Sequence, residues 1–186
     1  MEEQTNVNNE SRSDYNISEN ITEQITASTN NTEAYLQKVK SEQNLPLGLI
    51  AGFATAIAGA MIWAAITVAT EYQIAYMAIG LGFIVGFAVR LAGKGIDQIF
   101  GISAAILAIF GCLLGNLLSI IGFAAKGEGL GYFEAISLID FSVIPTIMIE
   151  SFNPMDILFY GIAIYAGYKY AFRQITQEEV DAYVPA

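Results

Sequence analysis

The chain has 186 residues, of which 54% are hydrophobic and only 14% are charged, and its mean hydropathy is +0.49. Soluble domains carry about 25% charged residues, so this composition excludes an ordinary soluble globular protein and predicts an all-α integral membrane protein. The sequence has no histidine and a single cysteine, Cys112, which argues against the usual metal, haem and thiol chemistry. We therefore expect no catalytic residue, no metal site and no cofactor.

The net charge is −10, and half of it falls within residues 1–45, which hold eight acidic and three basic side chains. The sequence has no cluster of lysine and arginine, which phosphate binding requires, so we expect no nucleic-acid partner. Residues 1–31 are rich in Asn, Glu, Ser and Thr, and such a segment cannot bury enough surface to offset its ordering entropy. The composition predicts a disordered acidic tail over residues 1–31, then a juxtamembrane helix over residues 32–44 with Thr32 at its N-cap.

Three long apolar stretches follow this tail. Residues 45–70 contain no charged side chain, and a helix of this length reaches about 39 Å, more than the ~30 Å hydrocarbon core of a bilayer. Residues 73–91 form a second apolar stretch, and residues 99–125 form a third. Short polar connections separate them, so the pattern predicts three membrane-spanning helices joined by tight turns.

Residues 130–150 are apolar but carry acidic side chains, and they are the ambiguous part of the chain. A membrane crossing here would place Asp140 near the middle of the bilayer, at a cost of about 2.5 kcal/mol or more. Glu134, Ser137 and Asp140 recur at nearly helical spacing and form one polar stripe. We expect an amphipathic helix in the membrane interface, with a re-entrant segment as the alternative.

The last apolar stretch, residues 154–173, is predicted to be a fourth span. Asn153 suits an N-cap and Pro154 suits the first helical turn. Several tyrosines of this stretch, Tyr160 among them, are spaced like an interfacial aromatic belt. Residues 174–186 are expected to form a short polar tail.

The lysines and arginines near the span ends predict the orientation. With four crossings and a cytoplasmic N-terminus, six of seven such cations lie in the cytoplasm and one, Lys126, lies outside, as the positive-inside rule favours. A fifth crossing through residues 130–150 would move Lys169 and Arg173 outside. The charges therefore predict a multi-pass protein of the cell (inner) membrane with both termini in the cytoplasm.

Small residues recur at four-residue spacing within the predicted spans. Gly82 and Gly86 form one GxxxG pair, Gly111 and Gly115 form another, and Gly59 ends a series of small residues in the first span. Small side chains let helix backbones approach closely in lipid. We expect these five glycines to pack the four helices together, with a homo-oligomer interface as the alternative.

Polar residues within the spans are few: Thr55, Thr67, Ser103, Cys112, Asn116 and Ser119. The last three recur about one helical turn apart and form a candidate polar stripe. An uncharged stripe of this kind either hydrogen-bonds to neighbouring helices or lines a narrow solute path. Ion-coupled transporters need an ionisable residue at depth, and none of the four predicted spans carries one near its centre.

The stretch from Trp63 to Gly95 resembles a helical hairpin of uncharacterised bacterial four-helix inner-membrane proteins. The residues that carry the resemblance are Glu71, Ala78, Gly80, Gly82, Val85, Gly86, Ala88, Val89, Arg90 and Gly95. In those proteins similar helices often follow a soluble or zinc-ribbon-like module, whereas residues 1–44 here contain no cysteine and so no zinc site. The resemblance implies a bacterial inner-membrane protein and no particular activity.

These features predict an integral membrane protein without a catalytic constellation, embedded in the lipid bilayer as an accessory or scaffold subunit. Its partner is expected to be another membrane protein or further copies of the chain. The alternative is a small channel or facilitator for ions or small solutes.

Overall fold

The computed structural model describes residues 2–72, 75–138, 140, 142–151 and 153–183, with side chains from residue 19 on. The described residues form eight α-helices and no strand, as expected for an all-α protein. The chain divides into two compact units. We call residues 1–41 with 174–186 the terminal unit, and residues 42–173 the bundle unit.

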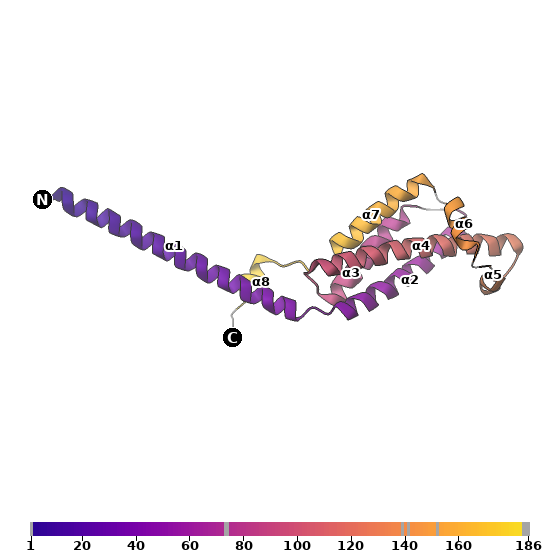
Figure 1. Ribbon diagram of the computed structural model, residues 1–186, viewed down its shortest axis with the longest axis horizontal. Coiled ribbons are helices and arrows are strands. Elements are labelled where there is room, and N and C mark those ends of the chain that lie inside the picture. The colour runs from indigo at the N-terminus through magenta and orange to yellow at the C-terminus, as the bar shows by residue number, and fades with distance from the viewer. Residues whose placement is uncertain (1, 73–74, 139, 141, 152, 184–186) are drawn as a thin grey trace. The chain divides into compact units, whose positions relative to one another are not determined.

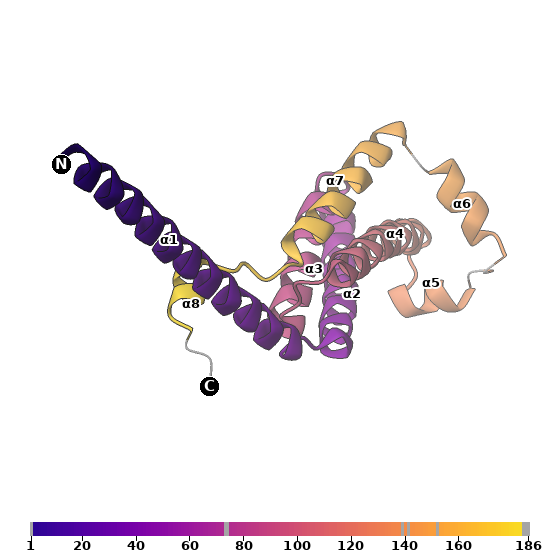
Figure 2. The ribbon, with the colours of Figure 1, turned by 60° about the vertical axis from the view of Figure 1, so that its left-hand side comes forward.

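Four helices pack side by side in the bundle unit (Figures 1 and 2): α2 (Leu45–Thr70), α3 (Met77–Gly93), α4 (Gln98–Glu128) and α7 (Pro154–Tyr170). In cross-section α2 neighbours α3 and α4, α7 also neighbours α3 and α4, and α3 packs against α4 across the diagonal. The helices therefore form a closed four-helix arrangement in which α2 and α7 occupy opposite corners.

A hydrogen-bond network ties the connections together at one end of the bundle. The Asn44 N–H donates to the Gly93 carbonyl at 2.9 Å, and the Arg173 N–H donates to the Gly95 carbonyl at 2.8 Å. The side chain of Gln43 accepts from the Ile96 N–H at 2.9 Å. Consequently α2 and α4 begin at this end, whereas α3 and α7 finish at it.

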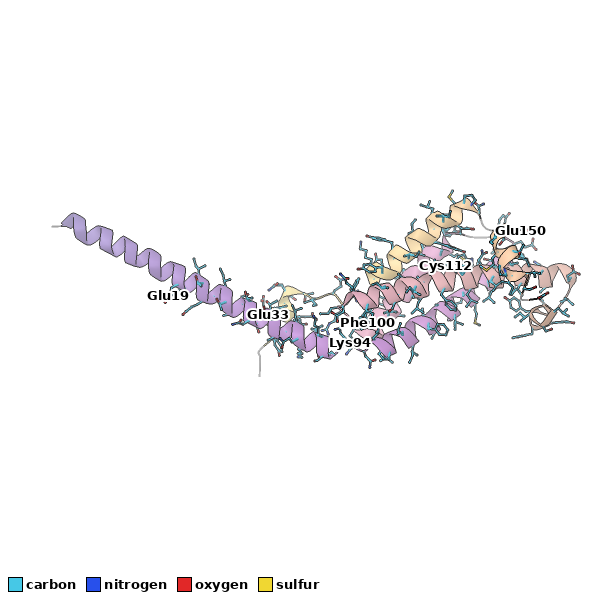
Figure 3. The ribbon with its side chains drawn as sticks, viewed as in Figure 1. Glu19, Glu33, Lys94, Phe100, Cys112 and Glu150 are labelled. Carbon is cyan, nitrogen blue, oxygen red and sulfur yellow. The ribbon has the colours of Figure 1, made fainter. Side chains whose placement is uncertain are left out.

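We name the two ends of the bundle after residues found there. Lys94 and Phe100 lie at the first, the Lys94 end, and Glu150 lies toward the opposite end (Figure 3). The opposite end is named the Glu71 end, because Glu71 caps α2 there in the left-handed conformation, with φ of 60°. The chain runs from the Lys94 end to the Glu71 end in α2 and α4, and back in α3 and α7.

The lengths of the helices support part of the predicted membrane topology. Helices α2 and α4 are long and apolar enough to span a membrane, and the pair α6 (Ile144–Glu150) and α7 passes the same test if taken as one span, although it is bent by 103°. Helix α3 is apolar but has only 17 residues. The structure therefore shows two candidate spans, or three if α6 and α7 are taken as one, and the predicted four crossings stay a prediction.

The helix boundaries follow the predicted ones closely in places. Helix α2 has the predicted bounds, and α4 extends slightly beyond residues 99–125 at both ends. Residues 73–74, where the second span was expected to begin, lie outside the described residues, and α3 begins at Met77. Helix α7 begins as predicted: the Asn153 side chain accepts the Met155 N–H at 3.0 Å and Asp156 completes a capping box. It ends at Tyr170 rather than residue 173.

The single interfacial helix predicted over residues 130–150 is wrong. The segment forms two short helices, α5 (Tyr132–Leu138) and α6 (Ile144–Glu150). Asp140 separates them, because its carboxylate accepts the Ser142 N–H at 2.9 Å and so turns the chain locally. Pro145 then occupies the first turn of α6, where its missing N–H costs nothing.

Helix α1 (Glu2–Ser41) covers the residues of the predicted tail and of the predicted juxtamembrane helix, and disorder of residues 1–31 stays a prediction. Thr32 lies inside α1, and its hydroxyl donates to the Ser28 carbonyl at 2.9 Å instead of capping a helix start. All side chains over residues 19–30 are exposed. This part of α1 is held by its own backbone hydrogen bonds, without the tertiary packing that stabilises most helices in proteins.

The C-terminal half of α1 packs against the short helix α8 (Gln177–Asp181). Val39 and Val180 are buried there, and the Asn31 amide donates to the Val180 carbonyl at 3.1 Å. The Tyr35 hydroxyl donates to a Glu179 carboxylate oxygen at 3.1 Å. Residues 174–186 were predicted to be a polar tail, but their described part contributes a capped helix to the terminal unit.

Candidate functional site: a polar seam in the bundle

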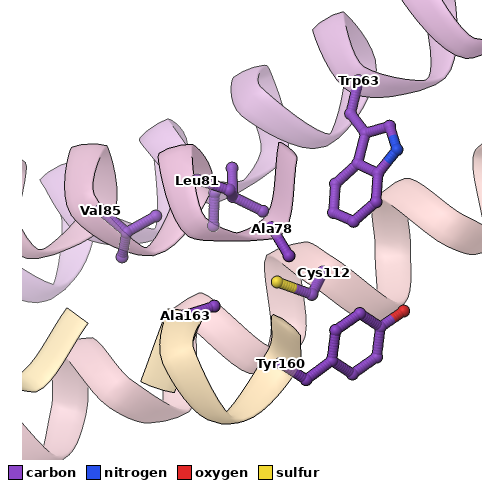
Figure 4. Close-up of a cluster of buried hydrophobic side chains, with 8 residues drawn as sticks. Trp63, Ala78, Leu81, Val85, Cys112, Tyr160 and Ala163 are labelled. Carbon is purple, nitrogen blue, oxygen red and sulfur yellow. The ribbon is translucent and has the colours of Figure 1, made fainter. Parts of the chain in front are cut away.

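The predicted polar stripe faces the interior of the bundle. Cys112, Asn116 and Ser119 of α4 are all buried, at 0%, 2% and 1% exposure. Cys112 lies in an apolar cluster with Trp63 and Tyr160 (Figure 4). The Ser119 hydroxyl donates to the Gly115 carbonyl of its own helix at 2.7 Å, which satisfies it without a partner from another helix.

Further buried polar side chains from α2 and α7 complete this region. Together they form what we call the polar seam: Trp63 and Thr67 of α2, Asn116 and Ser119 of α4, and Asp156 and Tyr160 of α7. Within each helix the paired residues are three or four positions apart, so they share a face. The seam occupies the half of the bundle toward the Glu71 end, because Thr67 is three residues from the end of α2 and Asp156 is the third residue of α7.

Sequence reasoning missed half of this seam. Trp63 was used only in the resemblance, and Tyr160 was assigned to an interfacial aromatic belt, although 94% of its surface is buried in the bundle core. The i, i+4 spacings of Trp63 with Thr67 and of Asp156 with Tyr160 were the available signal. That spacing identifies a shared face but not which neighbouring helix covers it.

One connection joins the seam across α4 and α7, and another closes the start of α7. The Tyr160 hydroxyl has the Asn116 amide as a hydrogen-bonding neighbour and feels the charge of Asp156. The Asp156 carboxylate also accepts the Asn153 N–H at 3.0 Å, closing the first turn of α7. Asp156 is thus a helix cap at the mouth of the seam, which accounts for a buried carboxylate so near a helix N-terminus.

The predicted packing glycines lie at contacts between the helices of the bundle. A Cβ added to Gly82 would meet the backbone of Ala163 in α7, with the Ala163 Cα at 2.7 Å. One added to Gly86 would meet the carbonyl oxygen of Gly167, also in α7, at 2.6 Å. Helices α3 and α7 therefore touch backbone to backbone.

The remaining packing glycines sit beneath side chains. Gly111 lies under Leu81, Gly115 under the ring of Trp63, and Gly59 under the tip of Leu81. These are intramolecular contacts between α2, α3 and α4, which is one of the two roles expected for the glycines.

The acidic side chains at the Glu71 end have structural partners. Glu71 accepts a hydrogen bond from the Lys126 ammonium at 2.6 Å, which holds the pKa of the Glu71 carboxyl below its ordinary value of 4.5. The Ser142 N–H likewise lowers the pKa of Asp140. Among the residues the structure describes, no group of three or more acidic or cysteine side chains could hold a metal ion.

An apolar groove of about 660 Å³ lies between α2 and α4, beneath α5. Its lining includes Ala65 of α2, Leu118 of α4, and Tyr132 and Phe133 of α5. The Tyr132 hydroxyl donates to the Leu118 carbonyl at 2.7 Å, which holds α5 over the groove. Phe133 is nevertheless 87% exposed, so the lining of the groove includes a large apolar side chain that is mostly uncovered.

The fold and these sites define a class: an all-helical protein with at least two helices long and apolar enough to cross a membrane and a tightly packed four-helix bundle. No family model, no curated protein and no solved structure matches the chain. The resemblance to bacterial four-helix inner-membrane proteins stays a prediction.

Proposed function

We propose that the protein is a four-crossing integral membrane protein of the cell (inner) membrane that acts as a non-catalytic accessory or scaffold subunit. It holds a membrane-spanning helix of another protein in the groove between α2 and α4. The observation that carries the proposal is this groove, which has apolar walls, is covered by α5 through the Tyr132–Leu118 hydrogen bond, and is lined in part by the exposed Phe133.

The connections support four crossings. Helices α2 and α4 both begin at the Lys94 end, so if both cross the bilayer in the same direction, the chain must return between them through α3. The same holds for α7, which finishes at the Lys94 end where Arg173 donates to Gly95. The pairing of α8 with α1 gives independent support, because two ends of a chain that pack together lie on one side of the membrane.

The charges support a cytoplasmic Lys94 end. Arg90, Lys94 and Arg173 lie at that end, while Glu71 at the other end is paired with Lys126. Cations flanking crossing helices stay preferentially in the cytoplasm.

The topology is tested with single cysteines introduced into a Cys112→Ala background. Lys94→Cys and Gln174→Cys should react with a membrane-impermeant maleimide only after the inside of the cell is exposed. Tyr72→Cys and Glu128→Cys should react in intact cells. Labelling of positions 72 and 94 from the same side would contradict a crossing by α3.

The scaffold function is tested by purification in mild detergent and quantitative identification of co-purifying membrane proteins. Ala65→Phe fills the proposed groove and should release the partner. Ala105→Phe is the matched control, since Ala105 lines a second apolar groove between α4 and α7. Equal partner recovery with both variants, or a clean homo-oligomer without a second protein, would overturn the proposal.

A small facilitator remains a second candidate because the polar seam contains buried hydrogen-bonding groups. Toward the Lys94 end, however, the core consists of tightly buried apolar side chains that include Val89, Phe100 and Ala104. The facilitator predicts solute flux in liposomes that Asn116→Leu abolishes. Flux unchanged by Asn116→Leu would remove that candidate.

A further inference from the structure

We propose that the polar seam is a binding site for a small neutral hydroxylic molecule, either internal water or a polyol, held by Trp63 and Thr67. This site is independent of the groove on which the scaffold function rests. It lies in the bundle core rather than on a face open to lipid.

The orientation of the Thr67 hydroxyl is the first observation. Serine and threonine hydroxyls in helices commonly donate to the carbonyl three or four residues before them, as Thr70 does to Ile66 at 2.8 Å and Ser119 to Gly115 at 2.7 Å. Thr67 does not, although it is completely buried, and its Oγ1 has no hydrogen-bond partner in the chain. Its hydroxyl is therefore not satisfied by its own helix.

The indole of Trp63 is the second observation. Trp63 is 3% exposed, and its Nε1 has no partner among the groups of the chain. The position of the ring is determined by Gly115, because a Cβ there would meet the Trp63 Cε3 atom at 3.0 Å. Figure 4 shows the indole nitrogen and the Tyr160 hydroxyl directed to the same side of the cluster, away from the Cys112 sulfur.

The donor set defines the chemistry of the ligand. The indole N–H only donates, so the ligand must offer an oxygen lone pair, and the hydroxyl of Thr67 can donate or accept. A cation is disfavoured because the indole N–H presents its positive end. An anion is disfavoured because the Asp156 carboxylate acts on the same region. A neutral hydroxyl meets these constraints, and buried water typically makes about three such hydrogen bonds.

The core beside the site is closed toward the Lys94 end. Thr67 lies one helical turn from the Glu71 end, and Trp63 lies one turn deeper. Beyond Trp63 the core toward the Lys94 end is closed by buried apolar residues that include Val85 and Val89. A ligand would therefore reach the site from the Glu71 end, and the seam does not continue as a path through the bundle.

Trp63 is the single tryptophan of the chain, so the intrinsic fluorescence of the full-length protein in nanodiscs reports on this site. A hydrogen-bonded indole emits at longer wavelength than a dry one. We expect the longer-wavelength emission in the wild-type protein. Emission typical of a dry apolar core would overturn the proposal without any variant.

Thr67→Val keeps the shape of the side chain and removes its hydroxyl. The direction in which it changes the thermal midpoint tests the proposal. If the hydroxyl binds a ligand, the variant should shift the Trp63 emission to shorter wavelength and lower the thermal midpoint by about 2–4 °C. If the hydroxyl is simply unpaired, the midpoint should stay unchanged or rise, which overturns the proposal. Thr55→Val is the matched control on the same helix and should leave the emission unchanged.

Glycerol titration separates the two sources of the hydroxyl. A saturable change in the emission of the wild-type protein that Thr67→Val abolishes assigns a polyol site. No response to glycerol, together with the expected emission and the loss of stability in Thr67→Val, assigns internal water.

Discussion

The backbone contact between α3 and α7 makes a quantitative prediction for Gly82→Ala. The new Cβ would lie 2.7 Å from the Ala163 Cα and 2.8 Å from its carbonyl carbon, where ordinary contacts of a Cβ begin at 3.4 Å. The Ala163 carbonyl oxygen would be closer still, so the two helices must separate by at least about 0.7 Å. Overpacking of this kind costs about 1–3 kcal/mol, and backbone atoms cannot rotate away as a side chain could.

Gly80→Ala is the matched control, because Gly80 lies two residues away in the same helix and a Cβ there meets nothing within 4 Å. Both variants gain the same helix propensity of about 1 kcal/mol over glycine. The difference between them therefore isolates packing. We expect Gly82→Ala to be less stable than Gly80→Ala by about 1–3 kcal/mol.

The assay is reversible unfolding of the purified protein in mixed micelles, followed by circular dichroism. Ala163→Gly should not rescue Gly82→Ala, since the contacts that matter are with the backbone of residue 163. Equal stability of the two glycine variants, or full rescue by Ala163→Gly, would refute the backbone contact.

Three further predictions concern the ends of the bundle and the terminal unit. Because Lys126 depresses the pKa of Glu71, this pair stabilises the fold at pH values above 4.5, and the stabilisation is lost as the pH falls through the depressed pKa. Glu71→Gln should therefore flatten that part of the curve of unfolding free energy against pH. A curve that the substitution leaves unchanged would contradict the prediction. Arg173→Ala removes a partly exposed ion pair with Glu42 at 3.1 Å and should cost about 0.2–1 kcal/mol at low salt and less at high salt, so a cost independent of salt would exclude an ionic origin. Val180→Asp places a charge in the buried contact of α8 with α1. It should raise the rate of amide hydrogen exchange over residues 174–183 and leave the rates over residues 42–173 unchanged. Amides of α8 that stay protected in the variant would contradict the packing of α8 against α1.

Features set by nearby residues were predictable from the sequence. The bounds of α2 follow from an uncharged stretch between polar flanks, and the start of α7 follows from the Asn153 cap and the proline after it. Each of these signals acts within one or two turns of helix, so no knowledge of the tertiary structure was needed.

Features set by packing between distant residues were not predictable in the same way. Tyr160 suits both a membrane interface and a helix core, and the rotation of α7 against α4 decides between them. Helix α8 has five residues, too few to form alone, and its contacts with α1 come from a segment more than a hundred residues earlier. The break between α5 and α6 likewise depends on the turn at Asp140.

The bundle brings together helices of unequal length, which has a consequence for the surrounding lipid. Helices α2 and α4, with 26 and 31 residues, form one side of the bundle, and α3 and α7, with 17 residues each, form the opposite side. The long pair extends about 39–46 Å and the short pair about 25 Å, compared with a hydrocarbon thickness of ~30 Å. If all four helices cross, as proposed, a bilayer around the protein would be compressed beside α3 and α7 and would accommodate tilted helices beside α2 and α4. The protein would then prefer thin regions of membrane on one flank, and this asymmetric thickness would itself orient neighbouring proteins around it.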